Sequence, residues 1–462
     1  MDIEQRFAAL GVAAPEILLP AGGVDLSKWA VIACDQFTRD RGYWAGVEAA
    51  AGEAPSALRL VFPEVYLEDD GREARIAAIH RAMETYLAGG VFALSRRGFV
   101  YLERSTPCHP LRRGLVMAVD LDRYDWKPGA ASLIRATEGT LPERLPPRMD
   151  IRRGALLEIP HILLLIDDEA DTVLPELGRR AKARPALYRA ELRPGAGAVT
   201  GWFVDGREDW DFFAGALEGL AGRTRTRYGG GRPLDGGSGE ASSPAEPSSP
   251  AEPFLFAMGD GNHSLATAKA VWEEYKEAHR DEGGLESHPA RWALVELENL
   301  YDPGIAFEPI HRFLPGTSAG EAESLLEGLP GSRWYSRPIS GTAELSALAG
   351  DRDAEYNRIG VISGGRCRLV ETSAPGLVID SLEPLLDSHF KHRPGAIDYI
   401  HGEDELFRLS AQPSSTGLLL PPVKKSGLFQ TVARRGPLPR KSFSMGEAEE
   451  KRYYLECRKL FR

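Results

Sequence analysis

Residues 254–276 constrain the fold more strongly than any other part of the chain. Residues 254–258 form a short apolar run that suits a buried strand, and a polar turn containing Gly259 and Gly261 follows directly. Glycine permits backbone conformations there that a β-carbon would resist. Apolar residues then recur at three- and four-residue steps, as on one face of a helix: Leu265, Ala268, Trp272 and Tyr275. The segment therefore predicts a strand, a tight turn and a helix in succession.

This turn places four polar side chains at the start of the predicted helix, namely Asp260, Asn262, His263 and Ser264. Unpaired backbone N–H groups and the positive end of the helix dipole attract anions at such a position. A carboxylate, an imidazole and an anion-binding turn so close together are typical of an active site. The same residue types are also ordinary in turns and helix caps, so their spacing alone does not decide between the two interpretations.

The composition indicates a globular protein and excludes several other classes. With 462 residues, of which 43% are hydrophobic and 27% charged, we expect two or three domains with ample core. No apolar stretch is long enough to span a membrane, and the first residues lack the pattern of a signal peptide. Four scattered cysteines predict neither a disulfide framework nor a thiolate metal site. We therefore expect a cytoplasmic protein, and the net charge of −11 argues against broad nucleic-acid binding.

Strand and helix patterns alternate along the chain, which predicts an α/β (mixed α+β) fold. Residues 29–34 suit a buried strand that ends at Asp35, residues 74–87 a helix, and residues 445–460 a closing helix. The expected organisation has four parts: an N-terminal α/β region (1–228), a disordered low-complexity insertion (229–253), the strand-turn-helix segment completing the core (254–300), and a C-terminal α+β region (301–462).

An arginine-rich stretch at residues 134–153 is the second candidate for chemistry. It combines three polar residues around a glycine with five arginines: Thr137, Glu138, Thr140, Arg135, Arg144, Arg148, Arg152 and Arg153. Because the guanidinium fork matches phosphate geometry, the stretch suits a polyphosphate pocket. The alternative is a solvated loop whose arginines pair with Glu138, Glu143 and Asp150. His311 and Arg312 follow an apolar run, and His161 is expected to be a core histidine.

Common catalytic motifs are missing from the sequence. We find no phosphate loop of the Gly-x-x-x-x-Gly-Lys-Ser/Thr type, no Gly-x-Ser-x-Gly elbow, no His-Glu-x-x-His and no dinucleotide-binding fingerprint. Standard ATPase, hydrolase and dehydrogenase interpretations therefore lose support.

An ordered series of motifs resembles the domain-of-unknown-function 1015 family and covers most of the chain. The motifs are Trp29-Ala-Val-Ile-Ala-Cys-Asp-Gln, Arg135-Ala-Thr-Glu-Gly-Thr, Gly259-Asp-Gly-Asn-His-Ser-Leu-Ala, Tyr301-Asp-Pro-Gly with His311-Arg312, Ile397-Asp-Tyr-Ile-His-Gly and Leu438-Pro-Arg-Lys-Ser. The central turn of that family is similar to the turn of the ParB/sulfiredoxin superfamily, which includes nucleotide-binding partition proteins, sulfiredoxin and an ADP-dependent free-serine kinase. The resemblance implies a ParB/sulfiredoxin-like nucleotide-binding core.

Within this resemblance, Asp260, Gly261 and His263 correspond to the Asp, Gly and second His of the usual Asp-Gly-His-His-Arg turn. The chain departs from it at Asn262, where His is usual, and at Ser264, where Arg is usual. The loss of that arginine puts the usual phosphate contact in doubt, unless residues 135–153 supply another. The turn contains no cysteine, so sulfiredoxin-type repair is disfavoured.

The sequence favours a phosphotransferase that uses a purine nucleotide (ATP or ADP) with Mg²⁺ and acts on a small hydroxylated metabolite. The expected catalytic residues are Asp260, His263, and Glu138 or Asp35 as the base, with Glu138 preferred because the arginines would hold it beside the phosphates. Mg²⁺ is expected near Asp260 or Glu138. The expected nucleotide contacts are Gly259, Gly261, Asn262, Ser264, Arg135, Thr137, Thr140, Arg144, Arg148, His311 and Arg312. Two alternatives stay open: a non-enzymatic nucleotide-binding switch, and a metal-dependent hydrolase that uses Asp260, His263 and Asp35.

Overall fold

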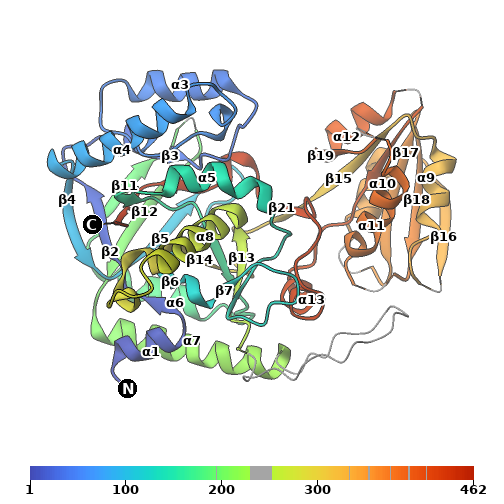
Figure 1. The fold of residues 1–462 in the computed structure, drawn as a ribbon. Coiled ribbons are helices and arrows are strands. Elements are labelled where there is room, and N and C mark those ends of the chain that lie inside the picture. The colour runs from blue at the N-terminus through green and yellow to red at the C-terminus, as the bar shows by residue number, and fades with distance from the viewer. Residues whose placement is uncertain are drawn as a thin grey trace. The chain divides into compact units, whose positions relative to one another are not determined.

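The computed structural model describes residues 1–193, 195–228, 252–331, 333–351, 354–374, 376–393, 396–412 and 414–461 (Figure 1). The chain forms two compact units: Met1–Ile305 together with Glu447–Arg462, and Ala306–Gly446. The expected α/β (mixed α+β) class is confirmed, because both units combine sheets with helices. Residues 229–251, which make up nearly all of the expected insertion, lie outside the described residues. The C-terminal stretch from Glu447, expected to belong to the region 301–462, groups with the first unit instead.

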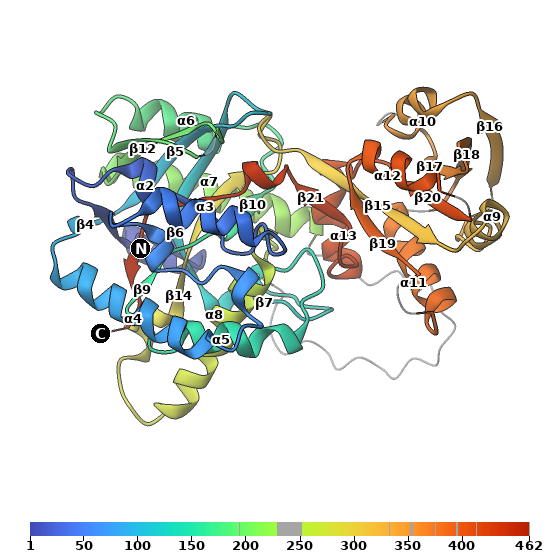
Figure 2. The same cartoon turned by 90° about the horizontal axis from the view of Figure 1, so that it is seen from above.

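In the described part of the chain, the first unit is built on a ten-stranded sheet. Its strands run in the order β11 (Tyr188–Glu191), β12 (Ala198–Val204), β5 (Phe99–Ser105), β6 (Arg112–Asp120), β14 (Trp292–Asn299), β10 (Leu163–Ile166), β13 (Phe256–Asp260), β8 (Ile134–Arg135) and β7 (Tyr124–Asp125), with β1 (Val12–Ala13) paired to β6. The helices α1 (Ile3–Ala9) and α6 (Val173–Ala181) both pack against α7 (Arg207–Tyr228). Figure 2 shows α5 (Leu145–Arg152) beside α8 (Asn262–Ala278), and these two helices are in contact.

The predicted strand-turn-helix is confirmed as β13, Gly261 and α8. β13 is buried because its apolar residues pair on both sides, parallel to β8 and antiparallel to β10. Gly261 has φ +81°, a left-handed conformation that favours glycine. In α8, Leu265, Ala268 and Trp272 are buried, as their spacing predicts. The helix α4 (Arg72–Ala88) likewise confirms the helix expected over residues 74–87.

The closing helix expected over residues 445–460 is wrong. β22 (Tyr453–Tyr454) pairs with β3 (Val31–Ile32), and β23 (Arg458–Lys459) pairs with β9 (Leu157–Glu158). Most side chains of this segment are buried in the first unit. Pairing with strands far away in the sequence holds the segment extended, because tertiary packing overrides the local helical pattern.

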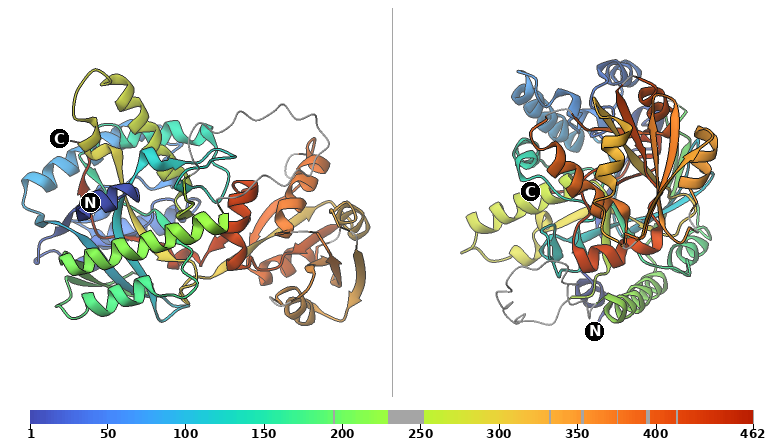
Figure 3. Two further views of the ribbon diagram at one scale, coloured as in Figure 1. Left: turned by 90° about the horizontal axis from the view of Figure 1, so that it is seen from below. Right: turned by 90° about the vertical axis from the view of Figure 1, so that its right-hand side faces the viewer.

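The second unit contains an antiparallel sheet with helices on both faces (Figure 3). Its strands run in the order β16 (Trp334–Ile339), β18 (Arg366–Thr372), β17 (Asn357–Ser363), β20 (Ser415–Leu419), β15 (Phe307–Pro315) and β19 (Asp398–His401), and β21 (Phe443–Met445) pairs with β15. One apolar cluster joins the sheet to α9 (Ala319–Leu326) and α11 (Val378–Phe390), and another joins it to α10 (Thr342–Ala349) and α12 (Glu403–Ser410). Within the described residues of both units, no helix is long and apolar enough to cross a membrane.

Candidate active site

The turn after β13 brings Asp260 against a lysine from the C-terminal segment. Nζ of Lys451 lies 3.0 Å from Oδ2 of Asp260, and Oδ1 accepts a hydrogen bond from the backbone N–H of Gly261 at 2.8 Å. Burial raises the pKa of Asp260, but the Lys451 ammonium, the Gly261 N–H and the nearby His161 together lower this pKa below its ordinary value. Asp260 is therefore a carboxylate that holds a cation beside the turn.

The start of α8 has no side-chain cap among the described residues. Gly261 occupies the N-cap position there. The first N–H groups and the positive end of the dipole therefore stay available to an anion. The Lys451 ammonium lies next to this position, paired with the carboxylate of Asp260, which directly precedes Gly261.

A chain of hydrogen bonds runs from the first turn of α8 to the C-terminal segment. Oγ of Ser264 lies 2.8 Å from Nε2 of His161, and the hydroxyl of Tyr454 lies 2.7 Å from Nδ1. The backbone N–H of Cys34 donates to the same tyrosine hydroxyl at 3.0 Å. His161 therefore belongs to a polar network at the turn, and the expectation of an ordinary core histidine does not describe it.

Asp35 and a half-buried ion pair complete the cluster. Oδ2 of Asp35 lies 3.8 Å from Nε2 of His161. Nε of Arg148 donates to Oε1 of Glu64 at 2.8 Å. Burial raises the pKa of Glu64, and Asp35 adds to the rise, whereas Arg148 opposes it. Two carboxylates, an arginine and a histidine thus share one small region of the first unit.

A cavity of about 150 Å³ adjoins these groups. Its polar lining includes the Ser264, His161 and Tyr454 chain and the Glu64–Arg148 pair. The remaining lining is largely apolar and includes Leu60, Phe62, Met83, Ile151 and Leu157. A few convergent polar groups in an apolar cavity are typical of a small-molecule site.

The arginine-rich stretch does not converge on this cavity as a whole. Arg148 and Arg152 line the cavity, each paired with a glutamate, Glu64 and Glu158 respectively. Arg153 is exposed and pairs with Asp150 and Glu274.

The other two arginines lie outside the cavity lining. The Arg135 guanidinium lies 4.6 Å from the centre of the Phe254 ring, and burial lowers its pKa to about 10. Arg144 is exposed, and its backbone carbonyl accepts a hydrogen bond from Arg148.

The loop after β8 lies beside the turn because β8 and β13 are parallel neighbours. Thr137 Oγ1 donates to the Met258 carbonyl at 2.7 Å, and the Leu141 N–H donates to Nε2 of His263 at 3.4 Å. This loop also carries Glu138. Thr140 Oγ1 and Asn262 Oδ1 are buried and have no hydrogen-bond partner among the described residues, so both keep bonding capacity at the turn.

His311 and Arg312 lie in β15 of the second unit, and both are buried. Arg312 Nε donates to Glu383 Oε2 at 2.9 Å, while the Leu420 N–H donates to His311 Nδ1 at 3.1 Å. Their polar atoms are thus engaged inside that unit.

The contacts of Asp260 argue against its expected role as a metal ligand. Both of its carboxylate oxygens already have partners, so an ion would have to displace Lys451. Across the described residues, no group of three or more His, Cys, Asp or Glu side chains is placed to hold a metal ion.

Sequence reasoning missed Lys451 and Tyr454 and misassigned His161. No local pattern links the stretch around Lys451 to the turn at Asp260, since the link is made by β22 pairing with β3. The only signal in the sequence is the run of two basic and two aromatic residues from Lys451 to Tyr454, which is unusual at the end of a surface helix.

The sequence profile of the family described as "Protein of unknown function (DUF1015)" matches residues 18–388, so the chain belongs to this family. No curated protein matches its sequence.

Similar solved structures include three proteins. SbnI with C-terminal truncation from Staphylococcus aureus is 10% identical, with 72% of this chain and 82% of that chain covered and a TM-score of 0.34. Free serine kinase in complex with AMP is 10% identical, with 75% of this chain and 92% of that chain covered and a TM-score of 0.36. A conserved hypothetical protein from Pyrococcus furiosus is 8% identical, with 74% and 94% covered and a TM-score of 0.32.

Proposed function

We propose that this member of the DUF1015 family binds a purine nucleotide, ATP or ADP, at the start of α8 and transfers a phosphoryl group to a small hydroxylated metabolite. One observation carries the proposal: Ser264, which lines the cavity with its partner His161, lies in the first turn of α8, directly after the uncapped start of this helix and the Asp260–Lys451 pair. The resemblance of the turn to a nucleotide-binding superfamily supports a purine nucleotide as the donor.

Phosphoryl transfer depends mainly on positioning and on neutralising the phosphate charge. The first N–H groups of α8 would bind phosphate oxygens, and Lys451 would supply positive charge beside them. Lys451 is only 10% exposed and is held by Asp260, so its ammonium is fixed before the nucleotide arrives. Asp260 thus acts as a positioning residue for that charge.

Ser264 stands where the family usually has arginine. Its hydroxyl is oriented by His161, which is in turn held by Tyr454, so it suits a hydrogen bond to a phosphate oxygen. In place of that arginine, phosphate oxygens would contact Lys451 and, from the cavity wall, Arg148, each of which is also paired with a carboxylate, Asp260 and Glu64 respectively. Thr140 and Asn262 offer further polar atoms at the turn.

The acceptor would occupy the cavity of about 150 Å³, which lies below the range of about 300–1,000 Å³ of drug-sized pockets. A small acceptor fits this volume, with its carbon skeleton against the apolar wall and its hydroxyl toward Ser264 and His161. We assign the proton-accepting role to Asp35, since its carboxylate lies beside His161. Glu138, in the neighbouring loop, is the second candidate for this role.

We route no step through a metal ion, because Mg²⁺ on Asp260 fits the contacts of this carboxylate poorly. The metal-dependent hydrolase has no specific observation in its favour, given the lack of a three-residue ligand group among the described residues. A non-enzymatic nucleotide switch would use the same binding site without the acceptor cavity.

The test is a nucleotide panel followed by a search for turnover. Purine nucleotides should stabilise the full chain, by about 2.7 kcal/mol at a ligand concentration 100 times the dissociation constant. The protein should then convert a component of a metabolite pool to a phosphorylated product, detected by mass spectrometry. Stabilisation without turnover would identify a switch, and failure of every purine nucleotide to stabilise the chain would refute the proposal.

A further inference from the structure

The cavity of about 150 Å³ in the first unit combines a short chain of polar side chains with a largely apolar wall. The polar chain consists of Ser264, His161 and Tyr454, which are linked by hydrogen bonds of 2.8 and 2.7 Å. The apolar wall is assembled from segments far apart in the sequence and includes Leu60, Phe62, Met83, Ile151, Leu157 and Leu460. An apolar cavity of about 150 Å³ is large enough to hold benzene. The volume therefore admits a small ligand whose body is apolar.

The charged side chains of this wall are paired with one another. Among the described residues that line the cavity, the carboxylates are Glu64 and Glu158 and the guanidiniums are Arg148 and Arg152. Nη2 of Arg148 lies 2.6 Å from Oε1 of Glu64, and Nη2 of Arg152 lies 2.5 Å from Oε1 of Glu158. These charges cancel, so a carboxylate or an ammonium group on a ligand would lose its hydration without gaining an unpaired counter-charge. The wall therefore favours an uncharged ligand.

The capacity of the wall to form hydrogen bonds with a ligand is limited as well. Thr267 lines the cavity, but its hydroxyl donates to the carbonyl of His263 at 2.7 Å. A hydroxyl is one donor with two acceptor sites, so Ser264 can bond a ligand hydroxyl while it keeps its bond to His161. Further ligand hydroxyls would face the apolar wall, where an unpaired hydroxyl is costly. A ligand with a single hydroxyl therefore fits the cavity best.

We propose that the phosphoryl acceptor is an uncharged alcohol with a single hydroxyl and an apolar body no larger than benzene. This acceptor belongs to the proposed phosphotransferase site, on which the inference rests. In the transfer, the alcohol oxygen forms a bond to the terminal phosphorus of the nucleotide, and the bond from that phosphorus to the bridging oxygen breaks. The hydroxyl proton passes to Asp35, beside His161. The products are a phosphate monoester and a nucleotide that has lost its terminal phosphate.

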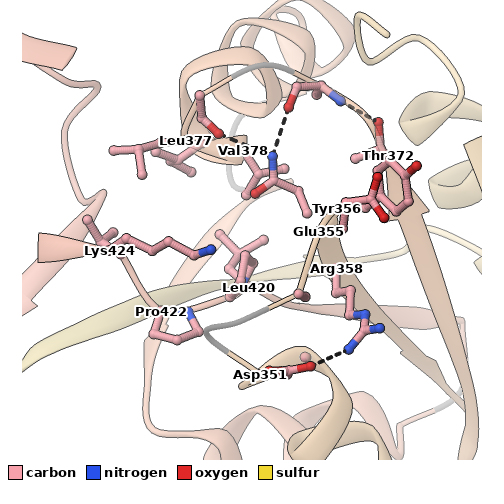
Figure 4. A pocket seen from close by; sticks show the side chains of 18 of the residues that line it. Asp351, Glu355, Tyr356, Arg358, Thr372, Leu377, Val378, Leu420, Pro422 and Lys424 are labelled. Carbon is pink, nitrogen blue, oxygen red and sulfur yellow. Dashed lines mark hydrogen bonds and ion pairs between the residues drawn. The ribbon is translucent and has the colours of Figure 1, made fainter. Parts of the chain in front are cut away.

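The second unit contains another cavity, of about 440 Å³, which would also hold a small ligand (Figure 4). Polar side chains such as Asn357, Arg358 and Thr372 line it, and large apolar side chains make up less of its lining than in the first unit. Leu377, next to the start of α11, is one of its apolar residues. An apolar alcohol should therefore prefer the cavity of the first unit, and a substitution at Leu377 shows whether it does.

The test compares three candidate acceptors of equal size on the full chain: isoamyl alcohol, β-hydroxypropionate and glycerol. The first is an apolar alcohol, the second carries a carboxylate, and the third has a hydroxyl on every carbon. Titrations followed by ligand-observed NMR, without nucleotide, give the three dissociation constants. Isoamyl alcohol should bind at least about tenfold more tightly than either of the others, because only its body gains from burial against the apolar wall.

Met83→Gln should weaken the binding of isoamyl alcohol about tenfold, because it places a polar amide in the apolar wall. Met149→Gln is the matched control, since Met149 is also buried and lies in α5 but is not among the lining residues. Met83→Leu keeps the wall apolar and should bind the alcohol almost as tightly as the wild-type chain does. Leu377→Gln, in the second unit, should leave the affinity unchanged.

Glu64→Gln should weaken the preference for uncharged ligands. It leaves the Arg148 guanidinium without its carboxylate partner, so β-hydroxypropionate should bind about tenfold more tightly than it does to the wild-type chain. An unchanged affinity for β-hydroxypropionate would mean that the paired charges do not exclude anions, which contradicts the inference.

The inference is overturned if isoamyl alcohol fails to bind, if β-hydroxypropionate or glycerol binds as tightly, or if Leu377→Gln weakens the alcohol as much as Met83→Gln does. Turnover separates the inference from the proposed function. Isoamyl phosphate formed with a purine nucleotide would support both. Binding of isoamyl alcohol without any phosphorylated product would support the ligand class and count against the phosphotransferase. Transfer only to glycerol or β-hydroxypropionate would support the phosphotransferase and overturn the inference.

Discussion

The ammonium of Lys451 lies 3.0 Å from the carboxylate of Asp260, although the two residues belong to distant parts of the chain. One residue ends β13 and the other precedes β22, and the pairing of β22 with β3 brings them together. This pair fixes the Lys451 ammonium beside the uncapped start of α8, and it is the contact on which the proposed phosphate site most depends.

Lys451→Met should weaken nucleotide binding and also destabilise the fold. Removal of one partner from a buried ion pair costs up to about 3–5 kcal/mol, and we expect about 2 kcal/mol because Asp260 is 25% exposed. The lowered pKa of Asp260 stabilises the fold at pH values above the ordinary carboxyl pKa, and this contribution disappears as the pH falls below it. The variant should therefore lose stability mainly at neutral pH, as measured by denaturant unfolding.

The matched control is the double variant Asp260→Asn/Lys451→Met, which leaves neither charge unpaired. It should recover part of the lost stability without recovering nucleotide affinity. Full nucleotide affinity in the double variant would show that Lys451 has no role in phosphate binding.

Ser264→Ala should reduce nucleotide affinity about tenfold, equivalent to about 1.4 kcal/mol, because the hydroxyl oriented by His161 is lost. The change in unfolding free energy should be smaller than about 1.5 kcal/mol, the upper end of the net contribution of one hydrogen bond. Calorimetry and thermal unfolding together separate the two effects. Ser287→Ala, at an exposed position of the same unit, serves as the control and should change neither quantity. If the two variants bind the nucleotide with equal affinity, Ser264 does not contribute to nucleotide binding.

Gly261→Ala should destabilise the first unit for two separable reasons. The φ of +81° costs an L-residue about 1–2 kcal/mol, and the new β-carbon would lie 3.2 Å from Cα of Ile162. Gly284→Ala isolates the first cost, since Gly284 has φ +93° and nothing lies within 4 Å of the place its β-carbon would take. In thermal unfolding, Gly261→Ala should therefore have a clearly lower unfolding temperature than Gly284→Ala. Equal unfolding temperatures would contradict the close approach to Ile162.

The stability of the second unit should fall as the pH drops from about 6.5 toward 4 because of His311. Burial, together with the neighbouring Arg312 and His401, lowers the pKa of His311 to about 4. The unfolded chain binds a proton across this window and the folded unit does not, so protonation favours unfolding by up to about 3 kcal/mol. His311→Gln should flatten the pH dependence in this window, as measured by unfolding at successive pH values. An unaltered slope would mean that His311 titrates normally.

Local patterns predicted the centre of the candidate site correctly. Three local features specified β13 and α8: the apolar run, the glycine turn and the spacing of Leu265, Ala268 and Trp272. They suffice because the positions of apolar residues along a strand or an amphipathic helix predict which side chains are buried.

The sequence also placed Asp260 in the turn, whereas the strand expected over residues 29–34 is shorter. Trp29 ends α2 (Leu26–Trp29), β3 covers only Val31–Ile32, and Asp35 lies in the turn that follows. The structure brings Asp35 and Asp260 near His161, although their proposed roles stay predictions.

Other expectations failed where the deciding contacts are distant in the sequence. For the arginine-rich stretch, the sequence left open a phosphate pocket or a loop whose arginines pair with carboxylates. Arg148, Arg152 and Arg153 do pair with carboxylates, but of the expected partners only Asp150 is among them, and the others lie outside the stretch. The expected closing helix is an extended segment that supplies Lys451 and Tyr454.

The sequence by itself determined the mixed α/β class and the strand-turn-helix at residues 254–276, since hydrophobic periodicity and glycine placement act over a few neighbouring residues. Only the tertiary structure decided that Lys451, Tyr454 and His161 share the site with Asp260 and Ser264. The physical reason is that the packing of the whole unit determines which strands and which charged side chains pair. A local sequence pattern therefore does not predict which distant segment lies beside a given turn.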